Sequence, residues 1–216
     1  MEWISEIANI NMTKGYSQYG EEAIIKYIIG NIGSTNRYCV EFGAGDGYTM
    51  SNTRMLLDNG WAGLMMDGDN QGNDEVRQEH ITADNINELF DKYKVPGKID
   101  LMSIDLDGND YWIWDKITRE ARVVVIEMNG CIEPGISKTI AYNPDHVWQS
   151  NDYYGASFDA LKKLGNSKGY KLVYQHQALN MFFIQENLVP GYDDSVINYR
   201  KCQYHPRASG GVWVNI

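Results

Sequence analysis

The chain has 216 residues, which fits one domain, and 43% of them are hydrophobic, which is enough for a buried core. Its net charge of −10 argues against a nucleic-acid substrate, because binding to phosphates depends on clustered Lys and Arg. The three cysteines lie far apart and form no CxxC pair, so neither a disulfide framework nor a zinc site is expected. No signal peptide and no apolar run of membrane-spanning length is visible, so we expect a cytoplasmic protein without a membrane partner.

The first half of the chain predicts alternating helices and strands. Apolar residues at helical spacing, and short apolar runs that stop at glycines or acids, mark the elements. The predicted helices cover residues 21–32, 50–60 and 85–94, and the predicted strands cover 37–42, 61–69 and, more weakly, 79–85.

The alternation continues to about residue 185. Strands are predicted at 99–105 and 121–128, with helices at 110–117 and 155–165. Two further runs, 169–175 and 180–185, are close enough to form an antiparallel pair at the sheet edge. The pattern predicts one domain, residues 1–216, with an α/β doubly wound, Rossmann-like sheet of about seven strands, mostly parallel. Residues 130–154 lack periodicity and are predicted to form a substrate lid.

A glycine-rich turn follows the first predicted strand, in the run EFGAGDGYTM at residues 41–50. Gly43 and Gly45 match the dinucleotide fingerprint G-x-G-x-x-G, but Tyr48 stands at its third glycine. Glu41 and Asp46 would repel a pyrophosphate. S-adenosylmethionine (SAM) carries no phosphate, and its sulfonium and ammonium are positive. The acids therefore favour SAM, and the glycines let the backbone approach it closely.

Two later acids complete the predicted cofactor site. Asp67 lies 24 residues after Gly43, near the spacing of about 20 expected for an acid that holds ribose hydroxyls. Asp69 is an alternative for the same role. Asp84 is expected to receive the adenine amino group, with Ile81 or Ile86 packed on the ring.

Acids also gather after the fourth and fifth predicted strands. Asp105 and Asp107 follow one strand, and Glu127 and Asn129 end the next. If the chain stays extended, residues two apart face the same way, and parallel strands bring both pairs into one cleft. Asp105, Glu127 and Asn129 would suit Mg²⁺. Without a metal, repulsion between the carboxylates would raise a pKa, and Asp107 would serve as base. Alternatively, Asp107 and the polar residues after it only cap the next helix.

The predicted lid carries His146, a second candidate for the general base, with an ordinary pKa near 6.5. Its aromatic and amide side chains would suit a sugar ring. A basic run near the C-terminus either meets a phosphate-bearing substrate or forms a solvated face. It comprises Arg200, Lys201, His205 and Arg207.

The run from Tyr38 to Asp69 resembles motif I and the second strand of class I SAM-dependent methyltransferases. SQYGEE, SIDLDGNDYWIW, VVVIEMN and YYGASFDALKKLGNSKGYKLV resemble the FkbM-like branch, and the likeness covers about residues 16–185. It implies O-methylation of a sugar or glycan hydroxyl. Asp105, Glu127 and Asn129 also resemble the Mg²⁺ ligands of metal-dependent O-methyltransferases, except that Met128 separates the acid from the amide. SQYGEE either closes the cofactor pocket or caps the first helix.

Three other functions remain open. A methyltransferase for another small molecule or natural product would use the same sheet. A NAD-dependent oxidoreductase is disfavoured by the missing third glycine and by the acids around the loop. A binding subunit without activity is disfavoured by the acids at 105, 107 and 127, since a scaffold needs no like charges in its cleft.

Overall fold

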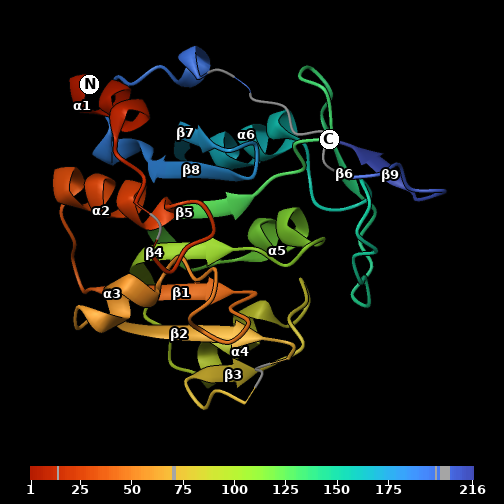
Figure 1. Ribbon diagram of the computed structural model, residues 1–216, viewed down its shortest axis with the longest axis horizontal. Coiled ribbons are helices and arrows are strands. Elements are labelled where there is room, and N and C mark those ends of the chain that lie inside the picture. Colours follow the sequence, from red (N-terminus) through yellow and green to blue (C-terminus); the bar gives the residue numbers. More distant parts are fainter. Residues whose placement is uncertain (14, 70–71, 198, 200–204) are drawn as a thin grey trace.

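The computed structural model describes residues 1–13, 15–69, 72–197, 199 and 205–216. Seven strands form one sheet in the order β3-β2-β1-β4-β5-β8-β7, which confirms the predicted α/β, Rossmann-like class (Figure 1). β1 to β5 run parallel, and β8 is antiparallel to both β5 and β7. The sheet strands are β1 Tyr38–Phe42, β2 Ala62–Asp67, β3 Val76–Gln78, β4 Lys98–Ile104, β5 Glu120–Glu127, β7 Tyr170–His176 and β8 Asn180–Gln185.

Helices cover both faces of this sheet and bury two separate cores. On one face lie α4, α5 and α6, which pack Phe90, Trp114 and Leu161 against the sheet. On the other lie α1, α2 and α3, with Ile24 and Leu56 among their buried residues. The helices are α1 Glu2–Ser5, α2 Glu21–Ile32, α3 Arg54–Asp58, α4 Ile86–Lys92, α5 Asp110–Lys116 and α6 Phe158–Ser167. No helix among the described residues is long and apolar enough to cross a membrane.

The central strands are buried on both sides, which explains their continuous apolar runs. In β5, Val123 and Val125 face one core while Val124 and Ile126 face the other, as the two-residue period of a strand requires. The parallel strands all point toward one side of the molecule (Figure 1). Their carboxyl ends form the edge at which a ligand is expected.

A small second sheet lies on that same side. β6 (Lys138–Ile140) pairs with β9 (Trp213–Asn215) in an antiparallel ribbon, which joins the predicted lid to the C-terminal tail (Figure 1). The sequence pattern did not predict this ribbon. Arg200 and Lys201 of the basic run lie outside the described residues, whereas Arg207 is exposed and His205 is half-buried.

Two predicted elements differ from the structure. The third strand is β3 at Val76–Gln78, and the predicted strand at 79–85 is wrong: those residues form the loop that leads into α4. The helix predicted at 50–60 contains only α3, and the three residues before it donate hydrogen bonds to Glu41 from Ser51 Oγ, Asn52 N and Thr53 Oγ1.

The edge strand β7 is partly covered by the short 3-10 helix η3 (Asp194–Val196). The Asp194 carboxylate accepts a 3.4 Å hydrogen bond from the backbone N–H of Leu172 in β7. Lys162 Nζ lies 3.4 Å from the same carboxylate, so the negative charge of Asp194 is compensated.

A buried aspartate joins the start of β1 to the middle of the sheet. Asp100, 1% exposed, accepts hydrogen bonds from the backbone N–H groups of Thr35, Asn36 and Arg37, and Arg122 Nε lies 3.3 Å away. Asp100→Ala leaves these donors unsatisfied, so we expect the free energy of unfolding to fall by about 3 kcal/mol in a urea titration. Asp115→Ala, at an exposed position, should change it by less than about 0.5 kcal/mol. Equal effects of the two changes would contradict this role.

Candidate active site

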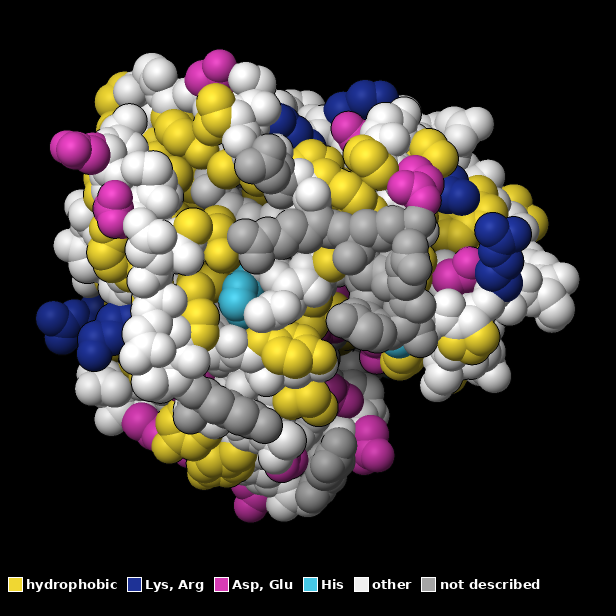
Figure 2. Space-filling model, turned by 45° about the horizontal axis from the view of Figure 1, so that its top comes forward, with side chains coloured by type: hydrophobic (Ala, Val, Ile, Leu, Met, Phe, Trp, Pro, Cys, Tyr) yellow, Lys and Arg dark blue, Asp and Glu magenta, His cyan; other side chains and the backbone are white. Residues whose placement is uncertain are grey.

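An acidic hollow lies at the carboxyl ends of β1, β2, β4 and β5. It has a volume of about 630 Å³. Five of the described residues that line it are acids, and none is Lys or Arg. The acids are Asp46, Asp67, Asp105, Asp107 and Glu127, and the other lining residues include Gly43, Gly45, Gln18, Trp148 and His205. On the face in Figure 2, Lys and Arg lie toward the margins.

Gly43 sets the close approach of the turn to β4. Its φ of +68° lies in the left-handed region, and a Cβ there would lie 1.6 Å from the carbonyl oxygen of Asp105. The turn can therefore sit directly over the end of β4 only with glycine at this position. The N–H of Gly45 donates 2.7 Å to Asp67 Oδ2, which ties the turn to the end of β2.

Glu41 lies beneath this turn and does not line the hollow. It is 3% exposed and accepts hydrogen bonds from Ser51 Oγ, Asn52 N and Thr53 Oγ1. Burial raises the pKa of the Glu41 carboxyl, and these hydrogen bonds oppose that shift. The predicted contact of Glu41 with a cofactor is therefore replaced by a contact with the chain that follows the glycine turn.

The remaining predicted cofactor acids have different positions. Asp46 accepts from the backbone N–H groups of Thr49 and Tyr48, which lowers its pKa, and it lines the hollow. Asp67 also lines the hollow and receives the N–H of Asp69 at 2.8 Å, in addition to that of Gly45. Asp84 is exposed, outside the hollow, and accepts the Tyr142 hydroxyl at 2.9 Å.

Three carboxylates converge in the hollow. One oxygen of each of Asp105, Asp107 and Glu127 lies within 4.8 Å of the other two. Burial, and then the charges of nearby carboxylates, raise the pKa values of Asp105 and Glu127 well above their usual range. Burial also raises the pKa of Asp107, although the charge of His146 opposes this shift. Burial raises the pKa of Asp110 to about 6. We name Asp105, Asp107 and Glu127 the acid trio.

Two features of the trio are unusual for acidic residues. Glu127 is 6% exposed, and its Oε2 has no hydrogen-bond partner among the described residues. Asp107 adopts a φ of +53°, which is uncommon outside glycine and is found mostly where the surroundings enforce it. Asp110 instead accepts the N–H groups of Leu106 and Gly108, so it closes the turn before α5, whereas no side-chain hydrogen bond from its N-cap residue Asn109 caps this helix.

Asn129 does not join the trio. Its amide donates to the carbonyls of Asp152 and Tyr154, and its oxygen accepts the N–H of Cys131. β5 ends at Glu127, so the alternation that would have placed residues 127 and 129 on the same side stops there. Asn129 instead fastens the predicted lid to the sheet, and Asp107 occupies the place expected for it beside Asp105 and Glu127.

His146 was predicted as a candidate base, and His205 only as part of the basic run, but the structure places His205 nearer the acid trio's hollow. His146 does not line the main hollow. His205 does, beside Trp148, with ring centroids 4.9 Å apart at 90°. The backbone of the C-terminal segment is fastened to the lid because Asp152 accepts Ala208 N and donates its own N–H to Pro206 O. No sequence pattern signals this contact, since the two segments lie more than fifty residues apart.

The segment before α2 also contributes to the hollow. Gln18 lines it, and Ser17 forms an isolated parallel β-bridge with Met50. The Glu21 carboxylate accepts the N–H of Tyr19, and the Glu22 carboxylate accepts that of Ser17. The two alternatives for SQYGEE are therefore compatible, because the segment both covers the hollow and is held to the start of α2.

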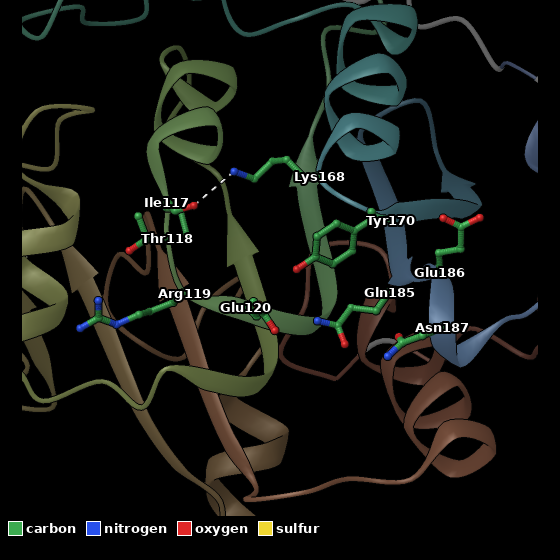
Figure 3. Close-up of a pocket in the computed structure, with 10 residues that line it drawn as sticks. Ile117, Thr118, Arg119, Glu120, Lys168, Tyr170, Gln185, Glu186 and Asn187 are labelled. Atoms are coloured by element: carbon green, nitrogen blue, oxygen red, sulfur yellow. Dashed lines mark hydrogen bonds between the residues drawn. The ribbon is translucent and has the colours of Figure 1, made fainter.

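A second hollow of about 600 Å³ lies at the opposite edge of the sheet (Figure 3). Two of its polar side chains, Lys168 and Tyr170, are bound to backbone carbonyls of the fold. Lys168 Nζ donates to the carbonyls of Asp115 and Ile117, and the Tyr170 hydroxyl donates to that of Ala121. Arg119 extends away from Lys168 in Figure 3. These contacts bind carbonyls at the C-terminal end of α5 and join the start of β7 to the start of β5. Among the described residues, no group of acids converges there.

Comparisons with known proteins give weak likenesses. No family model and no curated protein matches the chain. A structure of the N-terminal domain of EvdMO1 in the presence of SAH and D-fucose is 10% identical, with a TM-score of 0.44 over 85% of this chain and 95% of that one. The CurJ carbon methyltransferase is 10% identical, with a TM-score of 0.41 over 79% and 56%. A putative RNA methyltransferase from Pyrococcus horikoshii is 10% identical, with a TM-score of 0.39 over 85% and 94%. Likenesses at this level carry no argument about function.

Removing one charge of the trio should stabilise the apoprotein at high pH. The folded state holds the Glu127 proton more tightly than the unfolded chain does, and this stabilises the folded wild type at low pH. The stabilisation is lost as pH rises from the pKa of Glu127 in the unfolded chain through its pKa in the folded state. Gln at this position does not titrate. We expect Glu127→Gln to raise the free energy of unfolding by about 1 kcal/mol or more at pH 8, and by less at pH 5, in urea titrations with EDTA. An equal effect at both pH values would contradict a raised pKa.

Proposed function

We propose that the protein transfers a methyl group from SAM to a hydroxyl of a sugar or glycan, in the manner of the FkbM-like branch. The observation that carries the proposal is the charge of the main hollow. A glycine turn lies at its edge, five acids line it, and no Lys or Arg is among its described lining residues. A cofactor with a positive reacting end suits this surface, and a diphosphate does not.

The residues divide into a cofactor side and an acceptor side. Gly43, Gly45 and Asp67 would hold the cofactor, because the turn leaves room for a close backbone approach and Asp67 ends β2 within the hollow. The acceptor would lie near the acid trio, beside Trp148 and His205. An aromatic face with neighbouring polar groups is a surface on which a sugar ring can pack.

A bound SAM supplies a methyl group on a sulfonium, which is already activated for transfer. The acceptor hydroxyl is barely ionised at neutral pH and has to lose its proton as the carbon–oxygen bond forms and the carbon–sulfur bond breaks. Asp107 is the proposed base, since burial raises its pKa and it reaches solvent more readily than Asp105 or Glu127. The lid would exclude water and hold the acceptor in line.

The trio also fits a divalent cation. Its three carboxylates supply the oxygen ligands that Mg²⁺ prefers, and Glu127 Oε2 is buried without a partner among the described residues. Asp105, Asp107 and Glu127 would hold such an ion, with Asp107 in the place predicted for Asn129 and acting as a ligand instead of as the base. Its chemistry would be to lower the pKa of the acceptor hydroxyl.

The first test is cofactor binding. Calorimetry should detect binding of SAM and of its demethylated product S-adenosylhomocysteine (SAH), and none of NAD. Asp67→Asn should weaken SAH binding by about tenfold, because a hydrogen bond to a charged group is lost. Asp74→Asn removes the same charge at an exposed position outside the hollow and should leave the affinity unchanged. Binding of NAD but not SAH would identify the oxidoreductase alternative.

The second test is turnover. Methyl-labelled SAM is incubated with free, nucleotide-linked and polymeric sugars, with Mg²⁺ or with EDTA. Asp107→Asn should retain SAH affinity within about threefold but reduce transfer at least about 100-fold, the usual contribution of a general base. Asp115→Asn is the control of equal charge change. Activity that is unchanged in Asp107→Asn would exclude Asp107 as the base, and activity that survives EDTA would exclude the metal.

A further inference from the structure

A smaller hollow of about 140 Å³ adjoins the main one, and Gly68 and Leu106 line both. Its walls include Ile81, Pro144 and the ring of His146. At about 30 Å³ per water, its volume corresponds to four or five water molecules, so it can take a flat base but not a whole nucleoside. Gly68 follows Asp67 directly. If Asp67 holds a ribose, this hollow is where the attached base would lie.

His146 is brought to the hollow by a turn of the lid. Its backbone N–H donates 3.0 Å to the carbonyl of Asn143, with Pro144 at the second turn position. Asn109 Nδ2 donates 2.7 Å to that same carbonyl, which anchors the turn at the start of α5. The ring then lies against Gly108, where a Cβ would be 2.3 Å from His146 Cδ2. Glycine at 108 therefore leaves the space that the ring occupies.

The ring has an unused polar atom. His146 Nε2 is buried, with no hydrogen-bond partner among the described residues. Apart from Asn109, Glu79 and His80, the walls of the hollow are carbon-rich, as expected for a base-binding site. A buried nitrogen without a partner costs free energy, and the polar edge of a purine would satisfy it.

We propose that His146 recognises the adenine edge through Nε2, and that base binding steadies the turn of the lid segment 142–148 that carries it. This inference rests on the proposed function, since it assigns a residue to the cofactor of the same reaction. It replaces Asp84, which accepts the Tyr142 hydroxyl outside the hollow, as the polar contact to adenine. It also gives His146 a cofactor-binding role in place of the predicted role as general base.

The same turn connects the cofactor to the acceptor. Trp148 lies two residues after His146 and lines the main hollow, where its indole nitrogen donates to the carbonyl of Asn151. A base that contacts His146 would therefore also steady the turn that carries Trp148, and the adenosine half of the cofactor would contribute to the order of the acceptor site.

Calorimetry with SAH and with 5′-methylthioadenosine, which keeps the base but lacks the amino-acid end, tests the assignment. His146→Ala should weaken both ligands by the same factor, about tenfold. His146→Gln, whose amide nitrogen can take the place of Nε2, should recover most of the affinity. Gly108→Ala should reproduce the loss, because the added methyl displaces the ring. Val147→Ala is the control in the same segment, where Val147 is 69% exposed, and should bind normally.

Hydrogen exchange measures whether base binding steadies the lid segment. SAH should slow exchange of the amides at 142–148 in the wild type and in Val147→Ala, but much less in His146→Ala. Normal SAH affinity and normal protection in a folded His146→Ala variant would overturn the inference and leave the proposed function intact. A wild type that binds neither adenosine ligand would overturn both.

Discussion

Negative charge concentrated at the carboxyl edge of the sheet is the constraint on which the site depends. Each buried carboxylate there needs hydrogen-bond donors, a proton or a cation. Glu41 obtains three donors from residues 51–53, and Asp110 obtains two backbone N–H groups. Among the described residues the acid trio has no comparable set of donors, and Glu127 Oε2 has no partner there. The fold thus supplies donors to Glu41 and Asp110 but not, among the described residues, to the acid trio, which is the set that the proposed function uses.

The difference between these two kinds of acid has a backbone origin. Glu41 lies within β1, where the chain that returns over the strand can reach it, whereas the trio lies at or beyond the ends of β4 and β5. The acids at that edge face the main hollow, which Trp148 of the segment 130–154 also lines. The same strand ends that position the acids therefore also leave them without partners from the sheet.

The sequence predicted the fold well because its strands are apolar runs that stop at glycines or acids. It missed β3, since only Val76 of that strand is buried and apolar, and it missed the β6–β9 ribbon, whose partners are far apart in the chain. At the site, Asp67, Asp105, Asp107 and Glu127 were predictable from strand ends. Asn129 has contacts other than those predicted, because β5 ends at Glu127 and the alternation of side chains ends with it. Glu41 also has other contacts, because it lies inside β1 and is buried there. The place of His205 depends on contacts between two loops, and no periodicity encodes those.

The short helix beside β7 has a consequence for behaviour in concentrated solution. An edge strand with free amides is a template on which another molecule can add its own strand. Asp194 takes up the N–H of Leu172 and brings charge to that margin, with Lys162 close by. A foreign strand that docked there would have to displace this carboxylate, so polymerisation through β7 is opposed at that point.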